Sequence, residues 1–344
     1  MIPAVSSEPT LSQEPGRKRP WWQLPLQLVA SGLVLLLLLR EADPTAVWGA
    51  LVGASVPFLV LATVLKVGSV SLHELRLWLA LKPYKQLPIG PVFGIGYLGG
   101  LLNVVLPARA GDLLAIGLLK RELDVPGPAA LAAVGLTGFF EAAVFGVFLL
   151  CVMGFGATQW EVLLGTAQTM KAMGTLTALT LGAVFGSAVL VLVARKLSAT
   201  PQEAEPKPGI LSLIRESILR TGQGLSAWGP LAANLGLAAV QVVLVVGSFW
   251  ALLPALGLTV AYPLLAACGV IAIGAMAAIV LPPGLVAGQA ASAVFVLGFF
   301  GVSEAEAIAF TALSWVSNTV PPLVTGIGPL VSRLGRVREI LGRG

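Results

Sequence analysis

The chain has 344 residues, of which 57% are hydrophobic and only 11% are charged, and its formal net charge is +5. A soluble domain carries about 25% charged residues, so the composition excludes an ordinary soluble protein, because a soluble surface needs charges to stay dispersed. Several apolar runs approach the roughly 20 residues that cross a bilayer core, and they are continuous rather than alternating. The sequence therefore predicts an all-α polytopic membrane protein and not a β-barrel.

The chain opens with a polar, Pro-rich stretch, residues 1–20, which we expect to be a disordered cytoplasmic tail and not a cleaved signal peptide. Trp21 and Trp22 follow a basic cluster and are typical of a membrane-interface anchor. Residues 21–330 are expected to form one transmembrane domain. Six long apolar runs are predicted to be full spans, at about 21–39, 45–70, 128–153, 174–194, 230–256 and 303–330.

Two further apolar segments are interrupted by proline. Residues 89–119 break at Pro107, and residues 264–300 break at Pro282 and Pro283. Each segment must enter and leave the membrane on the same side if the loops on either side of it are to keep a consistent orientation. The sequence therefore predicts six full spans plus two re-entrant hairpins.

Positive charge orients the chain, because cytoplasmic loops carry an excess of Lys and Arg. The basic loop 195–227 and the basic tail 331–344 are predicted to be cytoplasmic, as are both termini, in a bacterial-type inner membrane. The charge lies at segment ends, which fits anionic lipid headgroups better than nucleic acid. The other cytoplasmic positions are Arg17, Lys18, Arg19, Arg76, Lys82, Lys85, Lys120 and Arg121.

The two halves of the chain, about 45–153 and 228–330, resemble each other. Gly111-Asp112 matches Gly288-Gln289, and Glu141 matches Asn318 at the same sequence offset. The hairpins open toward opposite sides, so the repeat is predicted to be inverted. Broken apolar segments at corresponding positions of two halves indicate the central site of a transporter. The predicted structural breaks are at Pro107, Gly111, Pro282, Pro283, Gly284 and Gly288.

Arg109 and Asp112 lie beside the first break. A charge at bilayer depth costs at least about 2.5–3.5 kcal/mol, and at this spacing the two can offset each other on one helix face. The guanidinium beside a helix N-terminus suits a phosphate. Alternatively, Arg109 reaches cytoplasmic water and forms a structural pair. Asn103 lies four residues before Pro107, and its side chain is expected to form hydrogen bonds with backbone groups that lose their helical partners at the break.

Glu141 is predicted to lie in the middle of a span. It either contacts substrate or couples a proton, or it has a structural partner such as Arg109. In the second half of the chain, the neutral residues Gln289 and Asn318 stand at the positions that correspond to Asp112 and Glu141. The candidate binding residues are thus Asn103, Arg109, Asp112, Glu141, Gln289 and Asn318.

Other polar residues have simpler interpretations. Asn234 and Gln241 share a helix face and favour helix–helix contact, whereas His73, Glu74 and Arg76 are expected to face water or headgroups at the end of a span. No catalytic constellation is visible, so we expect no enzyme, cofactor or metal. The two cysteines, Cys151 and Cys268, read as small core residues.

The run NVVLPARAGDLL, which begins at Asn103, and the turn after Lys120-Arg121 resemble the membrane domain of the lysylphosphatidylglycerol synthetase family. The resemblance implies a flippase-like domain without its synthetase, and it assigns Asn103, Pro107, Arg109, Gly111 and Asp112 to the family's motif. Asp112 stands where a Glu is usual. Further departures from the family's pattern are Ala115, Thr137, Gly138, Gln289 and Trp315, so the charged network is thinned.

Two functions follow from these patterns. The first is a translocator that moves or binds an anionic phospholipid or glycolipid headgroup, and the preserved motif and paired breaks favour it. The second is a non-transporting accessory that holds a lipid or cell-envelope glycolipid biosynthetic enzyme at the membrane, and the lost charges favour it. The expected partners are membrane lipids and, in the second case, such an enzyme.

Overall fold

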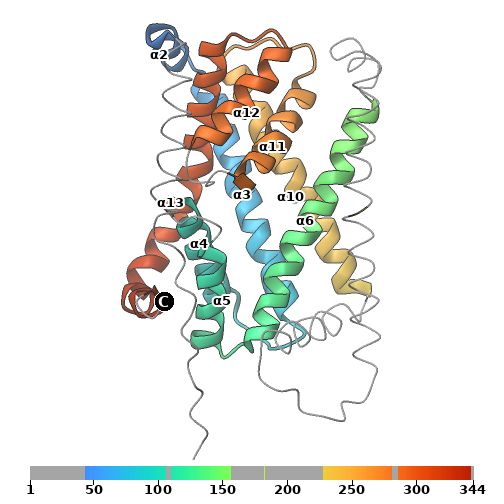
Figure 1. Ribbon diagram of the computed structural model, residues 1–344. Helices are drawn as coiled ribbons and strands as arrows, with labels where there is room; N and C mark the ends of the chain where they lie inside the picture. Colours follow the sequence, from blue (N-terminus) through green and yellow to red (C-terminus); the bar gives the residue numbers. More distant parts are fainter. Residues whose placement is uncertain (1–42, 106–109, 156–181, 183–227, 281–285, 342–344) are drawn as a thin grey trace, which may run out of the picture.

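The computed structural model describes residues 43–105, 110–155, 182, 228–280 and 286–341 (Figure 1). Throughout these ranges the regular structure is helical. The helices are α2 (Pro44–Val52), α3 (Val56–Leu81), α4 (Ile89–Val105), α5 (Ala110–Leu123), α6 (Gly127–Phe155), α10 (Trp228–Ala255), α11 (Pro263–Val280), α12 (Val286–Phe299) and α13 (Glu304–Leu341).

Four of the described helices, α3, α6, α10 and α13, are long and apolar enough to cross a membrane. Their outer faces expose large apolar side chains: Val60 and Val64 of α3, Val243 of α10 and Val324 of α13 are each more than half exposed. A water-soluble protein rarely exposes contiguous apolar surface on this scale. The chain is therefore an integral membrane protein. The spans predicted at 21–39 and 174–194 lie outside the described residues.

The apolar run predicted to begin near residue 45 is two helices instead of one. Asp43 caps α2 by accepting a hydrogen bond from the Thr45 amide, and the helix ends at Gly53. Ser55 precedes α3, and its amide donates to the carbonyl of Ala255 at the end of α10. The main helix therefore begins later than hydropathy suggests, and beyond the apolar run that ends near residue 70 it continues to Leu81.

The two interrupted segments form helix pairs. The first pair is α4 and α5, and the second is α11 and α12; the two helices of each pair pack against each other. In Figure 1 the first pair lies in the lower half of the bundle and the second in the upper half. The helix ends bracket the predicted breaks. The prolines themselves, Pro107, Pro282 and Pro283, lie outside the described residues, as do Arg109 and Gly284.

The long helices hold these pairs in place. α3 and α10 run antiparallel and form the most extensive contact among the described helices, while α13 packs against α4 and α12. Buried side chains of α10, α11, α12 and α13 form most of one apolar cluster. A second apolar cluster is formed mainly by α4, α5 and the adjoining parts of α3 and α6. A polar cavity borders both clusters. α13 continues as a helix to Leu341 and so includes most of the basic segment 331–344.

Candidate functional site

A cavity of about 480 Å³ lies among α3, α4, α5, α6, α10 and α11. Its wall carries charges of both signs, although its helices are otherwise apolar. Small residues of α4 and α6 leave the space, because glycine has no side chain to fill it. The polar residues of the wall are Lys66, Ser69, His73, Glu74, Asn103, Asp112, Thr137, Glu141 and Gln241.

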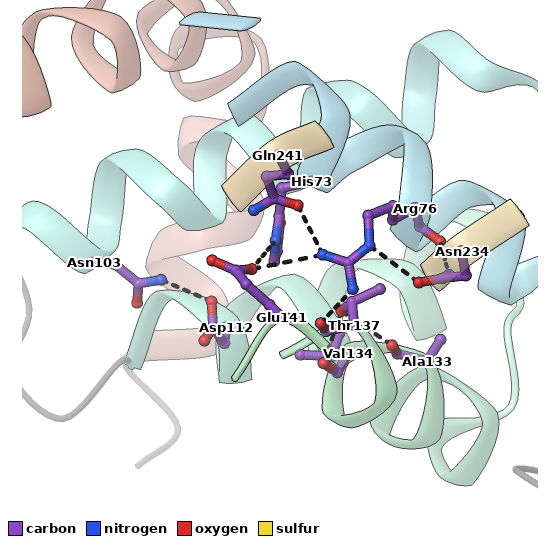
Figure 2. A network of polar contacts seen from close by, with 10 residues as sticks. All are labelled: His73, Arg76, Asn103, Asp112, Ala133, Val134, Thr137, Glu141, Asn234 and Gln241. Carbon is purple, nitrogen blue, oxygen red and sulfur yellow. Dashed lines mark hydrogen bonds and ion pairs between the residues drawn. The ribbon is translucent and has the colours of Figure 1, made fainter. Parts of the chain in front are cut away.

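Arg76 anchors the polar side of this region from α3. Its side chain is fully buried, and its guanidinium donates to Asn234 Oδ1 at 3.0 Å, Gln241 Oε1 at 2.7 Å and the Thr137 carbonyl at 2.7 Å (Figure 2). The amide of Asn234 donates back to the carbonyl of Arg76 at 3.3 Å. A guanidinium has five N–H donors in a fixed plane, so one side chain joins α3, α10 and α6.

The amides that hold Arg76 were predicted to join helices, and they do join α10 to α3. Asn234 and Gln241 lie two turns apart on one face of α10. Gln241 also lines the cavity, so it belongs both to the helix contact and to the site. The prediction for Arg76 itself was wrong: it lies inside the bundle and not in water or among headgroups.

Glu141 of α6 is the acidic partner of this cluster. Its Oε2 lies 3.2 Å from His73 Nδ1 and 3.7 Å from Arg76. In Figure 2, dashed lines join the carboxylate to both of these groups. Its side chain is 35% exposed and faces the cavity, so Glu141 has structural partners and remains accessible to a ligand.

A second polar pair closes the cavity on the side of the first helix pair. Asn103 of α4 donates from Nδ2 to Asp112 Oδ1 of α5 at 2.7 Å (Figure 2). The Asn103 amide thus donates to a side chain, whereas the sequence analysis expected it to bind backbone groups at the break. Gly111 makes this pairing possible, because a Cβ there would overlap the carbonyl of Gly99 and lie 2.7 Å from Asn103 Oδ1.

The cavity brings together three of the predicted binding residues, Asn103, Asp112 and Glu141. The second half contributes differently. Asn318 donates to the carbonyl of Ser314 in its own helix at 2.7 Å, and Gln289 accepts from Ser292 through its backbone carbonyl. Neither Gln289 nor Asn318 is among the described residues of the cavity wall.

Sequence reasoning missed three charged residues of the wall, Lys66, His73 and Glu74. All three lie on α3. A signal was present for Lys66, because a lone lysine inside an apolar run is costly and marks a functional interior. Within the described ranges, no three His, Cys, Asp or Glu side chains are placed to hold a metal ion.

The family model described as the lysylphosphatidylglycerol synthase TM region matches residues 25–326, well over half of the chain. The chain belongs to this family. No curated protein matches the chain. The family match includes both helix pairs and every described residue of the cavity wall, so the cavity is a feature of the family's membrane domain as it occurs in this chain.

Proposed function

We propose that this member of the family is a transporter and not an enzyme, and that it moves a phospholipid or glycolipid headgroup across the bilayer. The observation that carries the proposal is the polar cavity of about 480 Å³ among membrane-spanning helices. A polar headgroup cannot cross hydrocarbon without replacing its water shell, since unsatisfied polar groups cost several kcal/mol in lipid. A cavity lined by charges and amides supplies those replacement contacts.

The arrangement of the helix pairs supports an inverted repeat. In the first half a long helix, α3, precedes the pair α4–α5 and the long helix α6; in the second half α10, α11–α12 and α13 follow the same order. The pairs lie at opposite ends of the bundle (Figure 1). We therefore assign both pairs as re-entrant hairpins. Repeats of this kind allow a central site to open alternately to the two sides of the membrane.

The charges of the wall suit an anionic headgroup with additional polar groups. Lys66 and His73 are the basic residues of the described wall, and both belong to α3. We assign phosphate binding to these two residues, and we assign binding of the hydroxyl or amino groups of the headgroup to the carboxylates and amides of the wall. Arg109 adjoins α5 in sequence, and its role as a phosphate ligand remains a prediction.

A flip assay tests the proposal. The full chain is reconstituted into vesicles that contain fluorescent phosphatidylglycerol or a fluorescent glycolipid, and a membrane-impermeant quencher measures the label that reaches the outer leaflet. We expect Lys66→Gln to slow the movement about tenfold, because a hydrogen bond to a charged group contributes about 1.5–3 kcal/mol. Lys120→Gln is the matched control, since Lys120 is exposed and lies outside the cavity wall.

Lipid movement that equals that of protein-free vesicles would reject the translocator. The second candidate would then take its place, namely an accessory that positions a lipid or glycolipid biosynthetic enzyme. One observation favours it: the polar residues Gln289 and Asn318 of the second half are neutral, and Asn318 bonds within its own helix. An accessory predicts that a lipid-modifying enzyme copurifies with the chain and loses membrane attachment without it.

A further inference from the structure

Glu74 is a buried carboxylate that faces the cavity, and one of its two oxygens has no hydrogen-bond partner among the described residues. Its side chain lines the cavity wall, and the residue is 3% exposed. Among the described residues, no hydrogen-bond donor reaches its Oε2 atom. Gly96 of α4 lies directly against it, so that any Cβ at that position would overlap the carboxylate. The described helices therefore reserve space for Glu74, but none of their residues donates a hydrogen bond to Oε2.

Among the described residues of the cavity wall, the charged groups that accompany Glu74 come from α3, α5 and α6. Its own helix carries Lys66, His73 and Arg76, while α5 contributes Asp112 and α6 contributes Glu141. The facing residues of α4 and α10 in the cavity wall are the neutral amides of Asn103 and Gln241. Where the wall is described, its basic residues therefore all belong to α3.

The other two carboxylates of the wall have partners. Glu141 lies 3.2 Å from His73 and 3.7 Å from Arg76, and Asp112 accepts the amide of Asn103 at 2.7 Å. Glu74 is thus the carboxylate for which the described chain provides least compensation, and it shares the cavity with two others. Burial of an ionised carboxylate without a partner is so costly that the group takes up a proton instead.

We propose that Glu74 is a proton-binding site and that each transport cycle carries one proton on its carboxyl group. The coupling to transport rests on the proposed function; proton binding itself does not. In the cycle, Glu74 takes a proton from water on one side of the membrane and forms an O–H bond. That bond breaks when the cavity opens to the other side, and the proton passes to water there. No electrons are transferred.

Infrared spectroscopy of the full chain in lipid tests proton binding directly, because a protonated carboxyl group has a carbonyl stretch that a carboxylate lacks. We expect this band in the wild type near neutral pH. It should shift when the glutamates carry a ¹³C-labelled carboxyl group, and it should be lost in Glu74→Gln. Glu122→Gln is the matched control: the Glu122 side chain is only 9% exposed but binds Arg333 at 2.8 Å, so its removal should leave the band in place.

Two results would overturn proton binding: a band that persists in Glu74→Gln, or a wild-type band that ignores the glutamate label. If Glu74→Gln does not fold, Glu74→Asp decides the matter. Its acid band must then be insensitive to the glutamate label, because the protonated group has become an aspartate. A label-sensitive band in Glu74→Asp would assign the proton to another glutamate.

A transport measurement tests the coupling separately. Vesicles containing fluorescent phosphatidylglycerol are given a pH gradient of either sign, and the flip rate is compared with that at equal pH. The wild type should respond to the gradient, and Glu74→Gln should lose the response. Lipid movement that ignores the gradient in the wild type would overturn the coupling. Absence of any lipid movement would instead reject the proposed function. The infrared test of proton binding at Glu74 does not depend on that outcome.

Discussion

The buried guanidinium of Arg76 determines how α3, α6 and α10 meet. Three acceptors from two other helices converge on it at 2.7–3.0 Å, and Glu141 compensates its charge from 3.7 Å. Each of these groups is costly to bury alone. Together they satisfy one another, so the cluster both fixes the helices and forms the polar side of the cavity.

We therefore expect Arg76→Met to destabilise the protein strongly. Methionine matches the length of the stem but leaves the amide oxygens of Asn234 and Gln241 without their donor, and it removes one of the two basic partners of Glu141. Removing one partner of a buried charge cluster costs about 3–5 kcal/mol, which thermal unfolding in detergent should report as a large loss of melting temperature. Lys120→Met is the control: Lys120 is exposed, and such surface changes stay within about 0.5 kcal/mol.

Arg76→Lys sharpens the test. Lysine keeps the charge but has no planar fork, so it should recover only part of the lost stability. If Arg76→Met and Lys120→Met unfolded at the same temperature, the guanidinium would have no structural role.

Sequence reasoning found part of this cluster. The mid-span position of Glu141 and the shared face of Asn234 and Gln241 were visible in the chain, because polar side chains stand out inside apolar runs. Arg76 and Glu74 were not recognised, since charges near the end of an apolar run are ordinarily solvated. Hydropathy does not report which face of a helix turns inward, and here both charges turn inward.

At the scale of elements, proline positions predicted the two helix pairs and their approximate bounds. α4 and α5 pack closely at a glycine: the carbonyl oxygen of Gly99 and the backbone nitrogen of Asn103 both lie too close to Gly111 to leave room for a Cβ there. This close approach could not be predicted from sequence alone, because it depends on how the two arms are rotated relative to each other. It explains why Asn103 and Asp112, nine residues apart, meet at the cavity wall.

Gly111→Ala should accordingly separate α4 from α5. Overpacking of a close helix contact costs about 1–3 kcal/mol, and it should also lengthen the hydrogen bond between Asn103 and Asp112. The thermal unfolding temperature should fall. Gly135→Ala in α6 is the matched control, because its Cβ would meet nothing within 4 Å. Alanine should there be neutral or stabilising by up to about 1 kcal/mol. Equal stability of the two variants would contradict the close packing of α4 on α5.

At the scale of the whole molecule, the two ends of the bundle differ in charge. The lower end in Figure 1 carries the connections 82–88 and 124–126 with exposed Lys82 and Lys85. Lys85 also donates to the carbonyl of Leu123 at 2.8 Å, which ties these two connections together. Across the described upper end, residues 43–55, 256–262 and 300–306 contain acidic residues but no Lys or Arg.

This asymmetry leads to a prediction for orientation. Cytoplasmic loops are enriched in Lys and Arg, so we expect the lower end in Figure 1 to face the cytoplasm and the upper end to face outward. Cysteine labelling can test this in a background without Cys151 and Cys268. Gln86→Cys and Thr259→Cys place one thiol at each end, and both positions are exposed and uncharged.

A membrane-impermeant maleimide added to intact cells should label Thr259→Cys and spare Gln86→Cys, and permeabilised cells should show both. The two variants control for each other, because each differs from the background by one exposed thiol. The physical reason for the outcome is the cost of translocating short basic loops, which keeps Lys82 and Lys85 inside. The opposite labelling would invert the bundle. The cavity wall would remain as described, but α4 and α5 would then open outward, and both chain termini would no longer be expected in the cytoplasm.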